Sequence, residues 1–479
     1  MKVRNITSIL AASIALAIFV ASAAIGQTAS SAGAGGPSVK NKHIKSVTAI
    51  GEVFGDGEKF TAVAFEYDQD IINSKLSPSA YSVTGRTITK VYANNAPAKA
   101  SQGINGLYVV IELSPDDTTA AVFSGGPGSG GGPGAPGGPG EANGLGERGG
   151  PGASPTGPPN GGGGNGPSMS AGAKSAPAKT FVAQIGEVTT TSGRKYPGDA
   201  TAFESDKTIN LVVDDFKQFE FKDPATGMTL PYNLYIPRNY DKNKSYPLVL
   251  FMHDASVTGA GTTRTLTQGL GAVIWATPSE QAKHEAFVLA PAFGAGFGTE
   301  GAAGDTTADT VVHLVNSVAS QYSVDKNRMY TTGQSFGCMM SLAIMIKYPD
   351  LFSASMLVAG QRDAQLTSVL VHNRMWIIVS EGDTRAFPGM NASVEVWEKE
   401  GAKVSKATWN ARDSDAEMTV NARKMIAESN NIKYTKFVKG TTLPVGHAPD
   451  NEHMQTWKVA YTITAVRDWL FFQKKSTAQ

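Results

Sequence analysis

The run Gly333-Gln-Ser-Phe-Gly337 constrains the fold more than any other feature of this chain. A short β-branched and aromatic segment precedes it, and an apolar helical pattern follows from Cys338 to Tyr348. Small residues two positions either side of Ser335 permit a tight strand-to-helix turn that exposes the serine hydroxyl. The pattern is weak alone in a chain with 53 glycines. With a strand before it and a helix after it, Ser335 is a candidate nucleophile rather than an ordinary helix-cap serine.

A carboxylate partner for such a serine is expected downstream, at the carboxyl end of a buried parallel strand. The apolar run Met375-Trp-Ile-Ile-Val-Ser380 predicts such a strand, and Asp383 follows it directly after a glycine. Asp383 is therefore the candidate acid. Glu381 is the close alternative, and a plain Gly-Asp turn would explain the same residues without any chemistry.

Histidine is scarce, and chain order narrows the choice of a base, which follows the acid in this arrangement. Only His447 and His453 come after Asp383. His447 lies in an open loop rich in Pro and Gly, where a surface role is expected. His453 stands at the start of the last predicted helix and is the preferred base, because the chemistry needs a neutral imidazole beside a carboxylate.

The third component is a pair of backbone donors for a developing oxyanion. The turn after Ser335 aims the N–H of Phe336 at that position. A second N–H is expected from the end of the strand Tyr246-Pro-Leu-Val-Leu-Phe-Met-His253, hence from Asp254 or Ala255. Many hydrolases have a glycine where this chain has Asp254, so the loop must accommodate a side chain. His253 is expected to be buried and structural.

Composition sets further limits. The 479 residues exceed one ordinary domain, and a net charge of +1 with both signs interspersed implies no nucleic-acid-binding surface. Residues 1–26 resemble a cleaved secretion signal, with basic residues before an apolar stretch and small residues after it, so a secreted or periplasmic protein without stable membrane insertion is expected. Cys338 is the sole cysteine, which excludes an intramolecular disulfide and favours a small buried side chain over a reactive thiol.

The chain divides by pattern into two parts after residue 26. Short alternating strands at regular spacing predict a small all-β sandwich over about 44–215, interrupted at about 125–168 by a Gly/Pro-rich segment expected to be disordered. From about 216 to 475, strands alternate with helices, which predicts a mostly parallel sheet covered on both faces. The helices are expected near 307–322, 338–348, 394–400, 418–428 and 457–473.

Four segments together resemble a known group of secreted carboxylesterases. They are Thr229-Leu-Pro-Tyr-Asn-Leu-Tyr-Ile-Pro, Tyr246-Pro-Leu-Val-Leu-Phe-Met-His-Asp, Val324-Asp-Lys-Asn-Arg-Met-Tyr-Thr-Thr-Gly-Gln-Ser-Phe-Gly and Val466-Arg-Asp-Trp-Leu-Phe-Phe-Gln. The group is related to polyhydroxybutyrate depolymerase and feruloyl esterase type hydrolases, some of which carry an N-terminal immunoglobulin-like domain.

The resemblance implies an α/β-hydrolase domain after an immunoglobulin-like domain, with Ser335 as nucleophile, Asp383 as acid and His453 as base. It implies hydrolysis of short-chain or aryl esters, free or polymer-linked, with no cofactor and no metal. Asp254 in the oxyanion loop and Cys338 after the nucleophile depart from the group's usual glycines.

Two other hypotheses remain open on the sequence. A prolyl-oligopeptidase-like serine peptidase would use the same triad of Ser335, His453 and Asp383, although no propeller or acidic substrate anchor is evident. A non-catalytic surface-binding protein with a relic hydrolase domain would be compatible with Asp254. The complete order of serine, aspartate and histidine favours the serine esterase.

Overall fold

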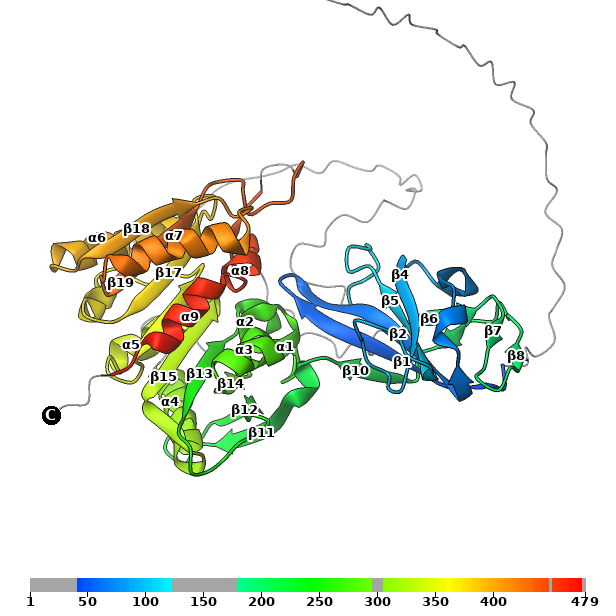
Figure 1. Ribbon diagram of the computed structural model, residues 1–479. Helices are drawn as coiled ribbons and strands as arrows, with labels where there is room; N and C mark the ends of the chain where they lie inside the picture. The colour runs from blue at the N-terminus through cyan, green and yellow to red at the C-terminus, as the bar shows by residue number, and fades with distance from the viewer. Residues whose placement is uncertain (1–40, 123–178, 295–304, 448–449, 476–479) are drawn as a thin grey trace, which may run out of the picture. The chain divides into compact units, whose positions relative to one another are not determined.

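The structure is a computed structural model that describes residues 41–122, 179–294, 305–447 and 450–475 (Figure 1). The expected signal segment and the Gly/Pro-rich segment lie outside these residues. Among the residues described, no helix has the length and apolar character that crossing a membrane requires.

The first part of the described chain is all β. A five-stranded sheet has the order β10-β1-β2-β5-β4, and smaller sheets join β3, β6 and β9 and pair β7 with β8. The strands are β1 (Ile44–Phe54), β2 (Gly57–Ile71), β3 (Tyr81–Val83), β4 (Ile88–Asn94), β5 (Gly106–Leu113), β6 (Phe181–Gln184), β7 (Val188–Thr189), β8 (Lys195–Tyr196), β9 (Phe203–Glu204) and β10 (Lys207–Asn210).

One apolar core joins these sheets. Val63, Phe65 and Val109 from the large sheet pack with Val182 and Tyr196 from the small ones. Alternate residues of β2 and β5 point to this core, and the residues between them, Ala62, Ala64 and Val110, belong to a smaller buried apolar cluster. Strands before and after the Gly/Pro-rich segment are paired, β3 with β6 and β1 with β10. The expected sandwich of short alternating strands is therefore present.

The second part is a nine-stranded mixed sheet in the order β11-β12-β14-β13-β15-β16-β17-β19-β18. The pairs β11–β12 and β12–β14 are antiparallel, whereas every pair from β14–β13 to β19–β18 is parallel. The strands are β11 (Phe216–Lys222), β12 (Thr229–Tyr235), β13 (Tyr246–Met252), β14 (Phe287–Pro291), β15 (Val324–Gln334), β16 (Ala354–Val358), β17 (Met375–Ser380), β18 (Val404–Trp409) and β19 (Ile432–Phe437).

Helices cover both faces of this sheet (Figure 1). Apolar side chains of α4, α5 and α6 share one core with the sheet, and those of α2, α7, α8 and α9 share the other. The central strands β13, β16 and β17 are buried along their whole length, as continuous apolar runs between two helical layers require. The helices are α1 (Arg264–Thr267), α2 (Leu270–Val273), α3 (Pro278–Lys283), α4 (Asp305–Gln321), α5 (Phe336–Lys347), α6 (Ala386–Lys399), α7 (Asp415–Ala427), α8 (His453–Ala460) and α9 (Thr464–Phe472).

The structure differs from the sequence prediction in four respects. The short helices α1, α2 and α3 were not predicted. The expected last helix is two helices, α8 and α9, separated by a turn at residues 461–463. Helix α6 begins eight residues earlier than predicted, and Asp383 accepts from the backbone N–H groups of Arg385 and Ala386 at its start. Edge strand β18 was not predicted, since its weak pattern of partly exposed residues gives little signal.

Candidate active site

The turn from β15 into α5 places Ser335 in a strained conformation. Its φ is 52° and its ψ is −118°, a region that residues other than glycine rarely adopt. A side chain cannot replace either flanking glycine without a clash. A Cβ on Gly333 would lie 2.4 Å from the backbone of Gly337, and one on Gly337 would lie 1.9 Å from the carbonyl oxygen of Met252. The two glycines therefore permit the tight turn that projects the serine.

Ser335, His453 and Asp383 lie within hydrogen-bonding distance in series. Ser335 Oγ is 2.7 Å from His453 Nε2, and His453 Nδ1 is 2.6 Å from Asp383 Oδ2. With Nδ1 protonated, His453 donates to the carboxylate, and its Nε2 lone pair faces the serine hydroxyl. The Trp457 ring meets the imidazole edge to face at 5.3 Å, one turn along α8, and so packs against it.

Asp383 is almost fully buried, with 1 % of its surface exposed. Burial alone would raise its pKa, but the hydrogen bond and charge of His453 and the backbone N–H groups of Ala386 and Arg385 outweigh burial and lower the pKa. The carboxylate form is thus stabilised beside the imidazole.

The alternative acid and base of the sequence analysis lie elsewhere. Glu381 points to a partly exposed ion pair, with Lys436 Nζ 3.1 Å from its carboxylate. His447 is exposed on the rim of the cavity, and Ser335 Oγ is hydrogen-bonded to His453 instead. The geometry therefore brings together Ser335, Asp383 and His453, and not these two neighbours.

The loop after β13 runs beside Ser335 and is held by side chains. His253 is fully buried, as expected, and its ring accepts at Nε2 from the N–H of Phe293 at 2.9 Å. Its Nδ1 then carries the proton and donates to the carbonyl of Asp254 at 2.7 Å. Burial lowers the pKa of His253, which favours this neutral form.

Asp254 locks the same loop through its carboxylate. Oδ1 accepts from the N–H of Ser256 at 2.7 Å, and Oδ2 accepts from Nε2 of buried Gln334 at 2.8 Å. Asp254 has an extended backbone, with φ −77° and ψ 173°, so its position does not require glycine. The departure from the usual glycine is thereby accommodated, with the side chain turned inward.

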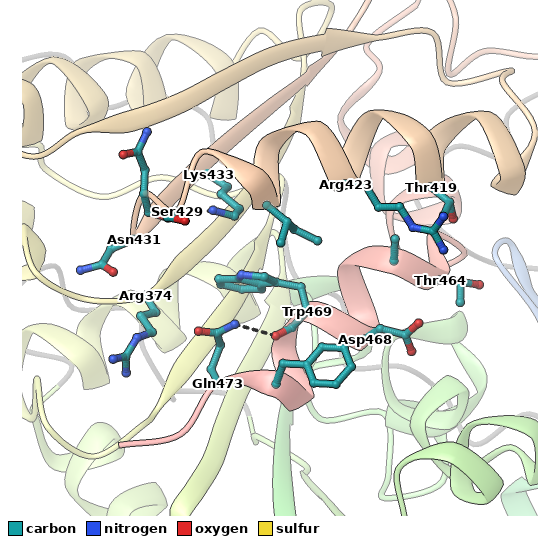
Figure 2. A pocket seen from close by; sticks show the side chains of 14 residues that line it. Arg374, Thr419, Arg423, Ser429, Asn431, Lys433, Thr464, Asp468, Trp469 and Gln473 are labelled. Carbon is teal, nitrogen blue, oxygen red and sulfur yellow. Dashed lines mark hydrogen bonds between the residues drawn. The ribbon is translucent and has the colours of Figure 1, made fainter. Parts of the chain in front are cut away.

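The cavity above the triad is open to solvent and has a mixed polar and apolar lining. It has a volume of about 460 Å³ and is lined by Ser335 and His453 together with Ala255, Arg385 and Trp457, among others. A larger cavity of about 750 Å³ lies around Trp469 and Lys433 (Figure 2). That cavity adjoins the amino ends of β17 and β19, whereas the triad follows the carboxyl ends of strands, where active sites of α/β sheets lie.

Two further features bear on the chemistry. Cys338 is buried in α5, and burial raises the pKa of its thiol to about 12, so it stays a protonated apolar-like side chain. Within the described ranges, no group of three or more His, Cys, Asp or Glu side chains has an arrangement that could hold a metal ion.

Sequence reasoning missed two buried residues beside the triad, Gln334 and Glu452. Gln334 precedes Ser335 and bonds Asp254, 80 residues away in the chain. Glu452 precedes His453 and bonds Ser380 at the end of β17 and two residues earlier in its own loop, Gly440 and Thr442. Their position next to catalytic candidates was visible, but their partners are distant in sequence and could not be read from it.

Comparisons with known proteins agree with this architecture. Residues 46–197 match the family described as esterase Ig-like N-terminal domain, and residues 230–415 match esterase PHB depolymerase. The crystal structure of a thermostable esterase aligns with a TM-score of 0.69 and 26% identity, covering 90% of this chain and 100% of that one.

Curated relatives match over shorter stretches. Acetylxylan esterase A of Emericella nidulans is 35% identical over 57 residues, which cover 12% of this chain and 19% of that protein. Acetylxylan esterase A of Aspergillus ficuum is 26% identical over 149 residues, covering 29% of this chain and 45% of that protein. The chain thus spans less than half the length of these relatives. The family matches and the thermostable esterase, taken with the fold, place the chain among the esterases of the α/β-hydrolase type that carry an immunoglobulin-like N-terminal domain.

Proposed function

We propose that the protein hydrolyses carboxylic esters through Ser335, His453 and Asp383 and an acyl-enzyme intermediate. The observation that carries the proposal is the continuous series Ser335 Oγ–His453 Nε2 at 2.7 Å and His453 Nδ1–Asp383 Oδ2 at 2.6 Å. Ser335 attacks the ester carbonyl while His453 accepts its proton and then returns it to the leaving alcohol. Water, deprotonated by His453, then releases the acid and the free serine.

Two backbone N–H groups are proposed to hold the oxyanion. Phe336 is the first residue of α5, so its N–H has no acceptor within the helix. In a trans peptide the C=O and N–H point in opposite directions. His253 holds the Asp254 carbonyl on the buried side, which supports the N–H of Ala255, on the cavity rim, as the second donor in preference to that of Asp254. Each donor stabilises the transition state by roughly 3 kcal/mol.

We further propose a small ester substrate, on the basis of the cavity volume, and no cofactor. The cavity is about 460 Å³ and is lined by several polar side chains, including Ser256, Asn451 and Gln455. Free and polymer-linked esters both fit such an open site. We further propose action outside the cytoplasm, on the basis of the signal-like residues 1–26.

The test is hydrolysis of a p-nitrophenyl acyl series, acetate to octanoate, by the wild-type protein and the Ser335→Ala variant. We expect turnover that is lost in the variant, and the series ranks the acyl groups by length. Labelling of Ser335 by a fluorophosphonate separates an active serine from a relic site. A wild-type protein that is folded, does not turn over any ester and does not label would refute the proposal.

Matched pairs of variants assign the other two roles. His453→Ala should abolish turnover, whereas His447→Ala should leave it largely intact. Asp383→Asn should lower kcat by about 10³- to 10⁴-fold, because the asparagine stabilises the wrong imidazole tautomer, whereas Glu381→Gln should have little effect. Comparing an ester with an amide of the same acyl group tests the peptidase alternative, for which the amide would be cleaved at a comparable rate.

A further inference from the structure

Glu452 is a buried carboxylate directly before His453 in the chain. Only 1 % of its surface is exposed. Its Oε2 accepts from the hydroxyl of Ser380 at 2.7 Å and of Thr442 at 2.6 Å, and its Oε1 accepts from the N–H of Gly440 at 2.6 Å. Three donors, one at the end of β17 and two in the loop after β19, thus converge on one side chain, so its acceptor capacity is well used.

These donors belong to the segments that carry the rest of the triad. Ser380 ends β17, and its carbonyl accepts from the N–H of Asp383 at 3.0 Å. Gly440 and Thr442 belong to the loop between β19 and α8. Glu452 therefore ties the segment of the acid and the loop after β19 to the first residue of the helix that carries the base.

The chain next to Asp383 leaves space for the Glu452 carboxylate. A Cβ on Gly382 would lie 1.9 Å from Oε1 of Glu452 and 2.4 Å from its Cδ. The absence of a side chain at Gly382 lets the carboxylate lie against the backbone next to Asp383. The N–H of Gly382 also donates to the Ser380 hydroxyl at 3.2 Å, which orients that hydroxyl toward Glu452.

We propose that Glu452 is a positioning residue that sets the distance and angle between Asp383 and His453. It acts through the loops and not as an acid of the reaction, because His453 Nδ1 is bonded to Asp383 and the Glu452 oxygens are bonded to Ser380, Thr442 and Gly440. The inference rests on the proposed triad and adds a fourth residue on which its geometry depends.

Glu452→Gln is the first test, because it keeps the size of the side chain but replaces one carboxylate oxygen by an NH₂ group. That NH₂ group cannot accept from the hydroxyl and N–H groups that donate to Glu452. We expect kcat to fall about 10- to 100-fold with KM changed less than threefold, since a small misplacement of the imidazole impairs proton transfer more than binding. Labelling of Ser335 by a fluorophosphonate should slow by a similar factor. Glu280→Gln is the matched control: Glu280 is equally buried and bonded to Arg467, and its loss should lower stability but leave kcat unchanged.

A double-mutant cycle separates positioning from general stability. If Glu452 acts through the Asp383–His453 pair, Glu452→Gln should lower kcat by less than threefold in an Asp383→Asn background. Full additivity of the two losses, or wild-type kcat in Glu452→Gln, would overturn the inference.

Should Glu452→Gln fail to fold, Thr442→Val and Ser380→Ala each remove one donor and should each lower kcat severalfold; wild-type kcat in both would overturn it as well. Failure of the proposed function itself is recognised separately, by a wild-type protein whose Ser335 neither turns over esters nor labels.

Discussion

Replacing Asp254 by alanine tests whether its carboxylate secures the oxyanion loop. The variant leaves the amide of Gln334, which is fully buried, without its acceptor, while the Oε1 atom of the same side chain already lacks a protein partner. A hydrogen bond to a charged group is worth about 1.5–3 kcal/mol. The N–H of exposed Ser256 can bond water instead and contributes about 1 kcal/mol or less. We expect the free energy of unfolding to fall by about 3 kcal/mol.

The same substitution should impair catalysis. Without the carboxylate the loop no longer holds the Ala255 N–H in position for the oxyanion. Losing one oxyanion donor raises the activation free energy by about 3 kcal/mol, which lowers kcat roughly 10²-fold. Asp254→Asn is the matched control. Its oxygen can still face Ser256, and a rotated Gln334 can accept its amide through Oε1, so we expect a loss near 1 kcal/mol in stability and less than tenfold in kcat.

Urea unfolding and p-nitrophenyl acetate turnover measure both quantities on the same samples. Asp254→Gly, which installs the residue common in related loops, should behave like the alanine variant, since it also lacks the carboxylate. A kcat within twofold of wild type and an unfolding free energy within about 0.5 kcal/mol for Asp254→Ala would refute the reasoning.

Three further predictions follow from the packing and charge of the site. Gly337→Ala should abolish soluble folded protein, because its Cβ would clash with backbone atoms of Met252. Gly227 has open space around it and a φ of 72°, so Gly227→Ala should lower the free energy of unfolding by only about 1–2 kcal/mol. Equal thermal stability of the two variants would contradict this reasoning. The lowered pKa of Asp383 gives stability that is present above about pH 4 and lost as pH falls through its folded-state pKa. Asp383→Asn should therefore be less stable at pH 7, with the difference from wild type shrinking below pH 4; a difference constant from pH 7 to 3 would rule this out. The thiol of Cys338, with its pKa raised to about 12, should resist iodoacetamide at pH 8 until urea unfolds the protein, and rapid labelling of the native protein would contradict its burial.

Much of the site was predictable because its residues follow strand ends in a fixed order. Ser335 and Asp383 each come within three residues of a buried strand whose apolar run is plain in the sequence. His453 was chosen over His447 from its place at a helix start, and it is the histidine that lies beside Ser335. The fold class followed from the same alternation of strands and helices.

The remainder depends on contacts between distant residues. In the sequence, Asp254 is a departure from the usual glycine of the oxyanion loop. Its bond to Gln334 could not be predicted, because nothing in the sequence connects the two residues. The sequence analysis did not single out Glu452, because only the folded chain brings Ser380 and Gly440 to it. Strand β18 and the break between α8 and α9 carry too little periodicity to be recognised locally.

The close approach of Gly337 to the Met252 carbonyl has a consequence for redesign of this protein. Strands β13 and β15 are hydrogen-bonded neighbours with Met252 opposite Gly333, so main-chain atoms set the spacing between the turn at Ser335 and the end of β13. Other side chains that line the cavity, such as those of Arg385 and Asp450, are exposed and lie outside that contact. Saturation mutagenesis of those loop positions can therefore vary ester preference widely while the reacting geometry stays constant, which makes the scaffold suited to directed evolution.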